Sequence, residues 1–68
     1  MRNVLIEARG NKTQMSVAKE INITQKYLSK LELGQRNPSL KVASRISNYY
    51  KLPIEVLFPD IFLSQNTT

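Results

Sequence analysis

The segment spanning residues 14–33 constrains the fold of this chain most, because its residues fit two short helices joined by a tight turn. Ala18 is small enough to let a second helix cross closely over the first. Asn22 stands where the chain must reverse, and asparagine is the non-glycine residue best suited to a positive φ there. Leu28 supplies a branched apolar side chain that can bury the second helix. We therefore predict two helices that cross at a wide angle.

Helical signals continue on both sides of this segment, without a sustained strand-like alternation. The predicted helices span residues 2–9, 14–21, 25–33, 40–50 and 53–57. The predicted N-caps are Thr13, Thr24 and Ser39, and the predicted stops are Gly10, Gly34 and Pro59. In the fourth helix the apolar positions Leu40, Ala43, Ile46 and Tyr50 follow the 3.6-residue period and are expected to face inward. The fold class is therefore expected to be all-α.

Size limits what can stabilise such a fold. A chain of 68 residues is expected to form a single domain, here residues 1–63, with residues 64–68 as a flexible tail. It has no cysteine and no histidine, so disulfides are excluded and the commonest general base is missing. Its core is marginal, so helix packing must carry the fold, helped by a partner subunit if there is one. Apolar runs are too short for a signal peptide or a membrane span, which favours a cytoplasmic location.

The charge of the chain favours a polyanionic partner. Lysine and arginine total 10 against 5 acids, and the isoelectric point is about 9.9. Small basic domains often bind nucleic acid, because each phosphate contact releases condensed counterions. A merely soluble basic surface would have the same composition, so position matters more than net charge. Basic residues are concentrated between Lys19 and Lys51, while Glu55 and Asp60 lie near the end.

Residues 2–58 resemble the Cro/repressor-like family, also called the XRE-family helix-turn-helix. The matching residues are Thr13-Gln14, Val17-Ala18, Ile21-Asn22-Ile23-Thr24-Gln25, Tyr27-Leu28-Ser29-Lys30-Leu31-Glu32, Gly34, Asn37-Pro38-Ser39-Leu40 and the stretch from Leu52 to Phe58. The resemblance implies a compact five-helix, lambda-repressor-like domain that docks its third helix in the major groove of DNA, usually as a dimer on a two-fold symmetric operator.

The sequence departs from the family pattern at several positions. Asn22 and Lys51 stand where the family usually has glycine. A left-handed lysine costs about 1 kcal/mol, so the turn after the fourth helix is expected to differ. Family members often pair an arginine late in the first helix with the glutamate matching Glu32. Arg9 fills that role if the following loop is shortened; otherwise Glu7 lies there and the pair is absent.

The resemblance assigns base reading to the third helix. Gln25 can pair with adenine N6 and N7, and Lys26 and Lys30 can donate to guanine O6 and N7. The competing interpretations are an ordinary polar helix face and, for Lys30, a phosphate contact. The residues expected at the DNA backbone are Gln14, Thr24, Tyr27, Arg36 and Asn37. For Gln14, Arg36 and Asn37 the alternative is solvated polar residues, and for Tyr27 it is packing beside Leu31.

The end of the chain carries more apolar surface than one small core is expected to hide. Tyr49, Phe58, Ile61, Phe62 and Leu63 are therefore predicted to form a homodimer interface. The alternative is that residues 61–63 fold back on their own domain.

The resulting functional hypothesis is a sequence-specific transcriptional regulator, acting as a repressor on double-stranded operator DNA. No catalytic residue, metal ligand or cofactor is expected, since no phosphate loop, metal cluster or activated nucleophile is present. The alternatives are an antitoxin that binds DNA and a toxin, a controller of a restriction–modification operon, and a protein-interaction module with no DNA role. Control of the regulator is expected to come through its concentration, through a protein effector or through the tail.

Overall fold

Six short helices follow one another in the computed structural model of the chain, which describes residues 1–62. They are α1 (Asn3–Arg9), α2 (Gln14–Glu20), α3 (Gln25–Leu33), α4 (Leu40–Tyr50), α5 (Ile54–Leu57) and α6 (Pro59–Phe62). This part of the chain holds no strand, and the predicted all-α class is confirmed. The helix α6 was not predicted. Pro59 does follow the end of α5, but it also begins α6, since proline is tolerated in a first helical turn. Leu63 and the predicted tail at 64–68 lie outside the described residues.

Side-chain caps begin three of the helices, at the residues the sequence predicts. The hydroxyl of Thr13 accepts a hydrogen bond from the Ser16 N–H at 3.0 Å. Thr24 accepts from the Tyr27 N–H at 3.0 Å, and Ser39 accepts from the Val42 N–H at 3.1 Å. Each cap satisfies a backbone donor that the helix itself leaves free, so the starts of α2, α3 and α4 are locally determined.

The turn between α2 and α3 has the geometry that the sequence predicts. Asn22 has a φ of 63°, in the left-handed region. Ala18 is 2% exposed and Leu28 is fully buried, so the two helices meet over a small residue and a branched one. The Ile23 N–H donates to the Ala18 carbonyl at 2.9 Å, which ties the turn to the end of α2. The packing of α2 against α3 is therefore fixed by sterics and by the main-chain hydrogen bond from Ile23.

The turn after α4 keeps the left-handed conformation despite its side chain. Lys51 has φ 59° and ψ 43°, and its N–H donates to the Ser47 carbonyl. The expectation that this turn would differ is wrong. Satisfying the last carbonyls of α4 offsets the cost of about 1 kcal/mol for a left-handed lysine.

One buried cluster draws on every helix from α1 to α5. Its members are Leu5, Val17, Ala18, Ile21, Leu28, Leu31, Ala43, Ile46, Leu57 and Phe58. Two expectations are corrected. Leu40 is 63% exposed, because it is the first residue of α4 and lies one turn before Ala43, the first buried residue of that helix. Phe58 is fully buried in this core, so its side chain offers no surface to a partner.

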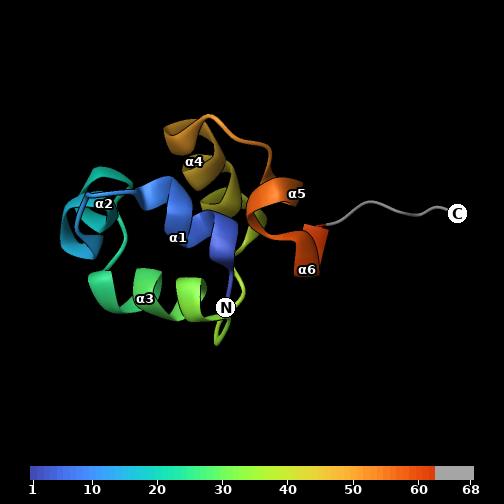
Figure 1. Cartoon of the computed structure of the whole chain (residues 1–68), viewed down its shortest axis with the longest axis horizontal. Helices are drawn as coiled ribbons and strands as arrows, with labels where there is room; N and C mark the ends of the chain where they lie inside the picture. Colours follow the sequence, from blue (N-terminus) through green and yellow to red (C-terminus); the bar gives the residue numbers. More distant parts are fainter. Residues whose placement is uncertain (63–68) are drawn as a thin grey trace, which may run out of the picture.

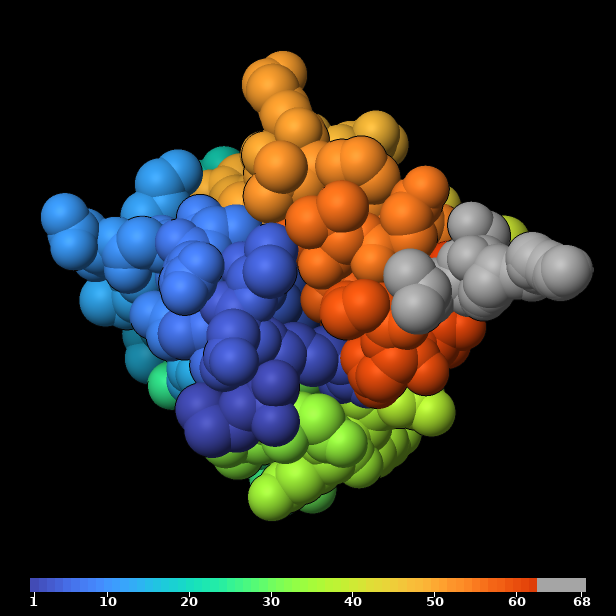
Figure 2. Space-filling model, turned by 45° about the vertical axis from the view of Figure 1, so that its right-hand side comes forward, coloured from blue at the N-terminus to red at the C-terminus, as the bar shows by residue number. Residues whose placement is uncertain are grey.

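Figure 1 shows how the helices are arranged around α1. Helix α3 runs along one side of the molecule, α4 lies on the opposite side, and the N-terminus lies beside the C-terminal end of α3. The first residues of the chain lie between the end of α3 and the α5–α6 segment (Figure 2). None of the helices in the described residues is long and apolar enough to cross a membrane.

Candidate nucleic-acid interface

One face of α3 is turned to solvent and carries polar and cationic side chains. Gln25 and Lys26 are exposed, and Lys30, one turn further along the helix, is half-buried. On the opposite face, Leu28 and Leu31 are fully buried. Because those two leucines anchor α3 to the core, the orientation of its outer face is fixed by apolar packing. The three residues predicted to read bases therefore lie together on one accessible surface.

Two shallow hollows flank this face of α3. The first is lined by Gln14, Gln25, Lys26, Ser29, Lys30, Leu33 and Gln35. The second is lined by Thr24, Lys26, Tyr27, Lys30 and Arg36. Lys26 and Lys30 border both hollows, and the lining residues include cations and no acid. We call this combined surface, with both hollows, the α3 face. Its positive charge is suited to a polyanion.

Tyr27 and Arg36 come together at one edge of the α3 face. The guanidinium carbon of Arg36 lies 5.8 Å from the centroid of the Tyr27 ring, within reach of a cation–π interaction. The stacking restricts where the long Arg36 side chain can go. Two residues predicted to contact the DNA backbone are therefore adjacent, although nine positions separate them in the sequence.

Gln14 lies at the other edge of the α3 face and is held in place. Its Nε2 donates to Glu32 Oε1 at 2.8 Å. A side-chain amide has two N–H donors, so one remains for a phosphate oxygen. The sequence did not predict this bond to Glu32. It gives Gln14 a fixed orientation beside α3.

Glu32 is 2% exposed, and its carboxylate also accepts hydrogen bonds from Arg9. Arg9 Nε lies 2.8 Å from Oε2, and Arg9 Nη2 donates to Oε1 at 3.1 Å. Of the two alternatives that the sequence left open, the structure therefore has the arginine pair, with Arg9 also bound to the Lys12 carbonyl at 2.9 Å. The hydrogen bond to Glu32 raises the pKa of Arg9. Nearby, burial and then the Glu32 charge raise the pKa of Tyr50 to about 12.

Asn37 contacts Arg2, a residue that the sequence pattern does not single out. Its Oδ1 accepts from Arg2 Nη2 at 3.0 Å, so the oxygen is turned toward the domain while the side chain stays exposed. Arg2 itself is 5% exposed. An arginine beside the start of a chain gives no local signal of burial, because its partners lie as far away in sequence as Asp60.

The residues predicted to form a dimer interface differ in how far they are buried. Tyr49 is half-buried, and Lys12 Nζ lies 5.0 Å from its ring centroid and 3.0 Å from its hydroxyl. Ile61 and Phe62 are half-buried and pack against the core, which agrees with the alternative that this end folds back. Their exposed parts remain available, while Phe58 belongs to the core and Leu63 lies outside the described residues.

Comparisons with known proteins give a consistent result. A family model described as "Helix-turn-helix" matches residues 5–57. A protein of Archaeoglobus fulgidus, named an uncharacterized HTH-type transcriptional regulator, is 37% identical over 51 residues, which cover 75% of this chain and 72% of the relative. A protein of the same description from Methanocaldococcus jannaschii is 33% identical over 48 residues, covering 71% of this chain and 73% of the relative. No solved structure matches the chain.

The pair between Arg9 and Glu32 can be tested through stability. Arg9→Met leaves a buried carboxylate with only the Gln14 amide, so we expect the free energy of unfolding to fall by about 3 kcal/mol. That is the lower end of the range for a broken buried pair, because Arg9 is partly exposed. The double variant Arg9→Met/Glu32→Met removes both charges and should recover most of the loss. Urea unfolding measures the free energy of unfolding of the single and the double variant, and Lys19→Met, at an exposed position, is the control. A loss no larger than that of the control would contradict the assignment.

Proposed function

The chain belongs to the helix-turn-helix family of the Cro/repressor-like (XRE) type, and on that basis we propose that it represses transcription by binding a two-fold symmetric operator as a homodimer. The family consists of DNA-binding transcription regulators, and the relatives' names describe such proteins. In this proposal the chain acts in the cytoplasm. The observation that carries the proposal is the α3 face, which gathers cationic and amide side chains on a helix anchored from behind.

Base reading is assigned to Gln25, Lys26 and Lys30. Gln25 is the first residue of α3, directly after the Thr24 cap, and it is exposed. In this docking geometry the N-terminal residues of the second helix of the motif approach base edges most closely. The glutamine amide can both donate to and accept from adenine, while the two lysines can donate to guanine. Gln25 is therefore the residue most directly tied to sequence preference.

Phosphate contacts are assigned to the two edges of the α3 face. At one edge Gln14 has a free N–H beside the start of α2, where the helix dipole favours an anion. At the other edge are Thr24, Tyr27, Arg36 and Asn37. Asn37 keeps its amide N–H groups for phosphate, since only its oxygen is used by Arg2. Contacts on both edges would hold α3 in register along the groove.

Dimerisation is assigned to the exposed parts of Tyr49, Ile61 and Phe62. One helix reads only a few base pairs, whereas two copies held about 34–36 Å apart read half-sites in successive turns of the major groove. Phosphate contacts also double in a dimer, so binding becomes steeper in salt. A two-fold symmetric operator follows from a two-fold symmetric protein.

The proposed base contact of Gln25 predicts a change of preference rather than a uniform loss. Gln25→Ala should cost about 1–3 kcal/mol on the operator and relax base choice at one position in each half-site. Sequencing of DNA fragments selected by the wild-type chain and the variant measures this. Asn48→Ala, which changes an exposed amide on α4, is the matched control and should leave the selected sequence unchanged. Equal loss on operator and random DNA would make Gln25 a backbone contact.

The dimer proposal predicts a concentration-dependent mass in solution. Wild-type chain should pass from monomer to dimer as its concentration rises, and Phe62→Glu should shift that transition to higher concentration by placing a charge in the interface. Sedimentation equilibrium measures it, with far-ultraviolet circular dichroism to show that the variant is folded. The control is Met15→Glu, which places the same charge on a residue of α2 that is 65% exposed. A wild-type chain that stays monomeric, or a folded Phe62→Glu that dimerises equally well, would refute the assignment.

A further inference from the structure

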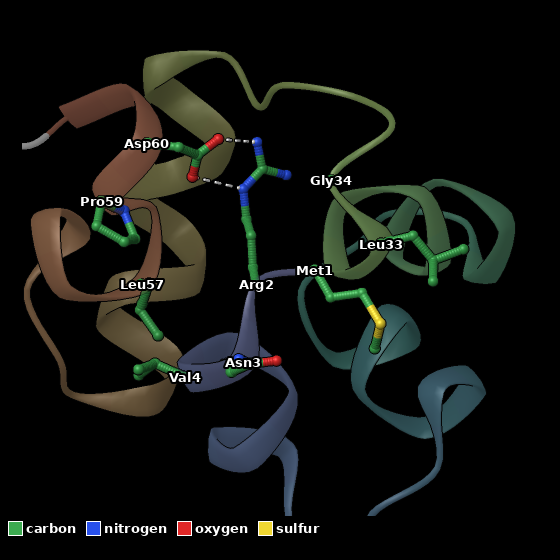
Figure 3. Close-up of a pocket in the computed structure, with 9 residues that line it drawn as sticks. All are labelled: Met1, Arg2, Asn3, Val4, Leu33, Gly34, Leu57, Pro59 and Asp60. Atoms are coloured by element: carbon green, nitrogen blue, oxygen red, sulfur yellow. Dashed lines mark hydrogen bonds and ion pairs between the residues drawn. The ribbon is translucent and has the colours of Figure 1, made fainter.

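The guanidinium of Arg2 lies inside the domain and all five of its N–H donors are used. Nε and Nη2 donate to the two carboxylate oxygens of Asp60 at 3.0 and 2.9 Å (Figure 3). Nη1 donates to the Leu31 carbonyl at 2.6 Å and to the Arg36 carbonyl at 2.8 Å. Nη2 also donates to Asn37 Oδ1 at 3.0 Å. We propose that Arg2 is a positioning residue for DNA binding, which holds the segment at 34–37 so that Arg36 faces the phosphate backbone.

The segment at 34–37 is tied at its beginning by α3 itself. Gly34 has a left-handed φ of 81° and reverses the chain after the helix. The Gln35 and Arg36 N–H groups both donate to the Lys30 carbonyl, at 2.9 and 3.3 Å. These bonds fix where the segment leaves α3. The carbonyl of Arg36 accepts no hydrogen bond from α3.

Arg2 supplies that second attachment. Its guanidinium donates to the Arg36 carbonyl and to Asn37 Oδ1. The peptide groups on both sides of Arg36 are therefore hydrogen-bonded, since the Arg36 N–H already donates to Lys30. Arg2 is itself fixed, since its own N–H donates to the Glu32 carbonyl at 2.9 Å and its guanidinium lies 5.3 Å from the centroid of the Phe58 ring. With its backbone held in this way, Arg36 reaches the Tyr27 ring at the edge of the α3 face.

Asp60 connects the same cluster to α6. It is the counter-ion of Arg2, and the hydrogen bond from Arg2 lowers the pKa of Asp60 below its ordinary value of 3.8. Its side chain remains about half exposed, whereas that of Arg2 is 3% exposed. Asp60 therefore neutralises the buried charge, while the contacts to Arg36 and Asn37 set the position of the loop. The two roles involve different donors of one guanidinium and can be separated.

The test rests on the proposed function and compares salt dependence with stability. Arg2→Lys keeps the charge, but three donors on one nitrogen cannot reach acceptors spread across the guanidinium plane. We expect its binding to a short mixed-sequence duplex to show a slope of log affinity against log salt shallower by about 0.9, the value of one lost phosphate contact. Arg36→Ala should flatten the slope equally, and the double variant should flatten it no further.

Asp60→Asn is the matched control. It weakens the ion pair but leaves the bonds to Arg36 and Asn37, so it should lower the thermal midpoint without changing the salt slope. If Arg2→Lys, measured well below its midpoint, keeps the wild-type slope, or if Asp60→Asn flattens it as much, Arg2 is only structural. Additive slopes in the double variant would also overturn the proposal.

A measurement on the wild-type chain covers the case in which Arg2→Lys does not fold. Nuclear magnetic resonance should show slowly exchanging Arg2 Nη–H groups, which donate to Arg36 and Asn37, and their protection should persist in the DNA complex because Arg2 acts through the loop and not on phosphate. Loss of that protection on binding would mean that the cluster comes apart and positions nothing. A wild-type chain that binds no duplex at all would refute the proposed function instead, and Arg2 would still show its protected Nη–H groups.

Discussion

The buried carboxylate of Glu32 is the constraint on which the rest of the structure depends. A charge at 2% exposure is tolerated only if it is paired and hydrogen-bonded, and here Arg9 of α1 and Gln14 of α2 supply the partners. Three helices therefore meet at one side chain of α3. The hydrogen bond from Gln14 to Glu32 also orients the Gln14 side chain. Glu32 therefore stabilises the domain and also fixes one edge of the α3 face.

A second polar cluster acts at the end of the same helix. Arg2 binds the Leu31 carbonyl through its side chain and the Glu32 carbonyl through its backbone N–H, so two hydrogen bonds from one residue hold the last turn of α3. Because the apolar core of this chain is small, these charged hydrogen bonds fix the orientation of α3 more tightly than apolar packing alone would. In the proposed function this rigidity matters, because base edges are read only when the helix is presented at a defined depth and angle.

Local features of this fold were predictable from the sequence, and long-range polar pairs were not. The threonine and serine caps, the left-handed Asn22 and the small Ala18 each follow from residue chemistry within one turn. The α3 face could be predicted because helical spacing places Gln25, Lys26 and Lys30 on one side of α3 once Leu28 and Leu31 are assigned to the core. Arg2 could not, since its partner Asp60 is 58 positions away. Phe58 was misassigned because apolar character alone does not distinguish a core from an interface.

In the proposed function, the α3 face is the surface that contacts DNA. The most direct test is a titration of the ¹⁵N-labelled chain with a short duplex, followed by nuclear magnetic resonance. If the α3 face contacts DNA, amide and side-chain shifts should change at Gln14, in residues 24–30 and in residues 35–37, and α5 should change little. Shifts concentrated in α5 and α6, with the α3 face unaffected by duplex in excess, would contradict it.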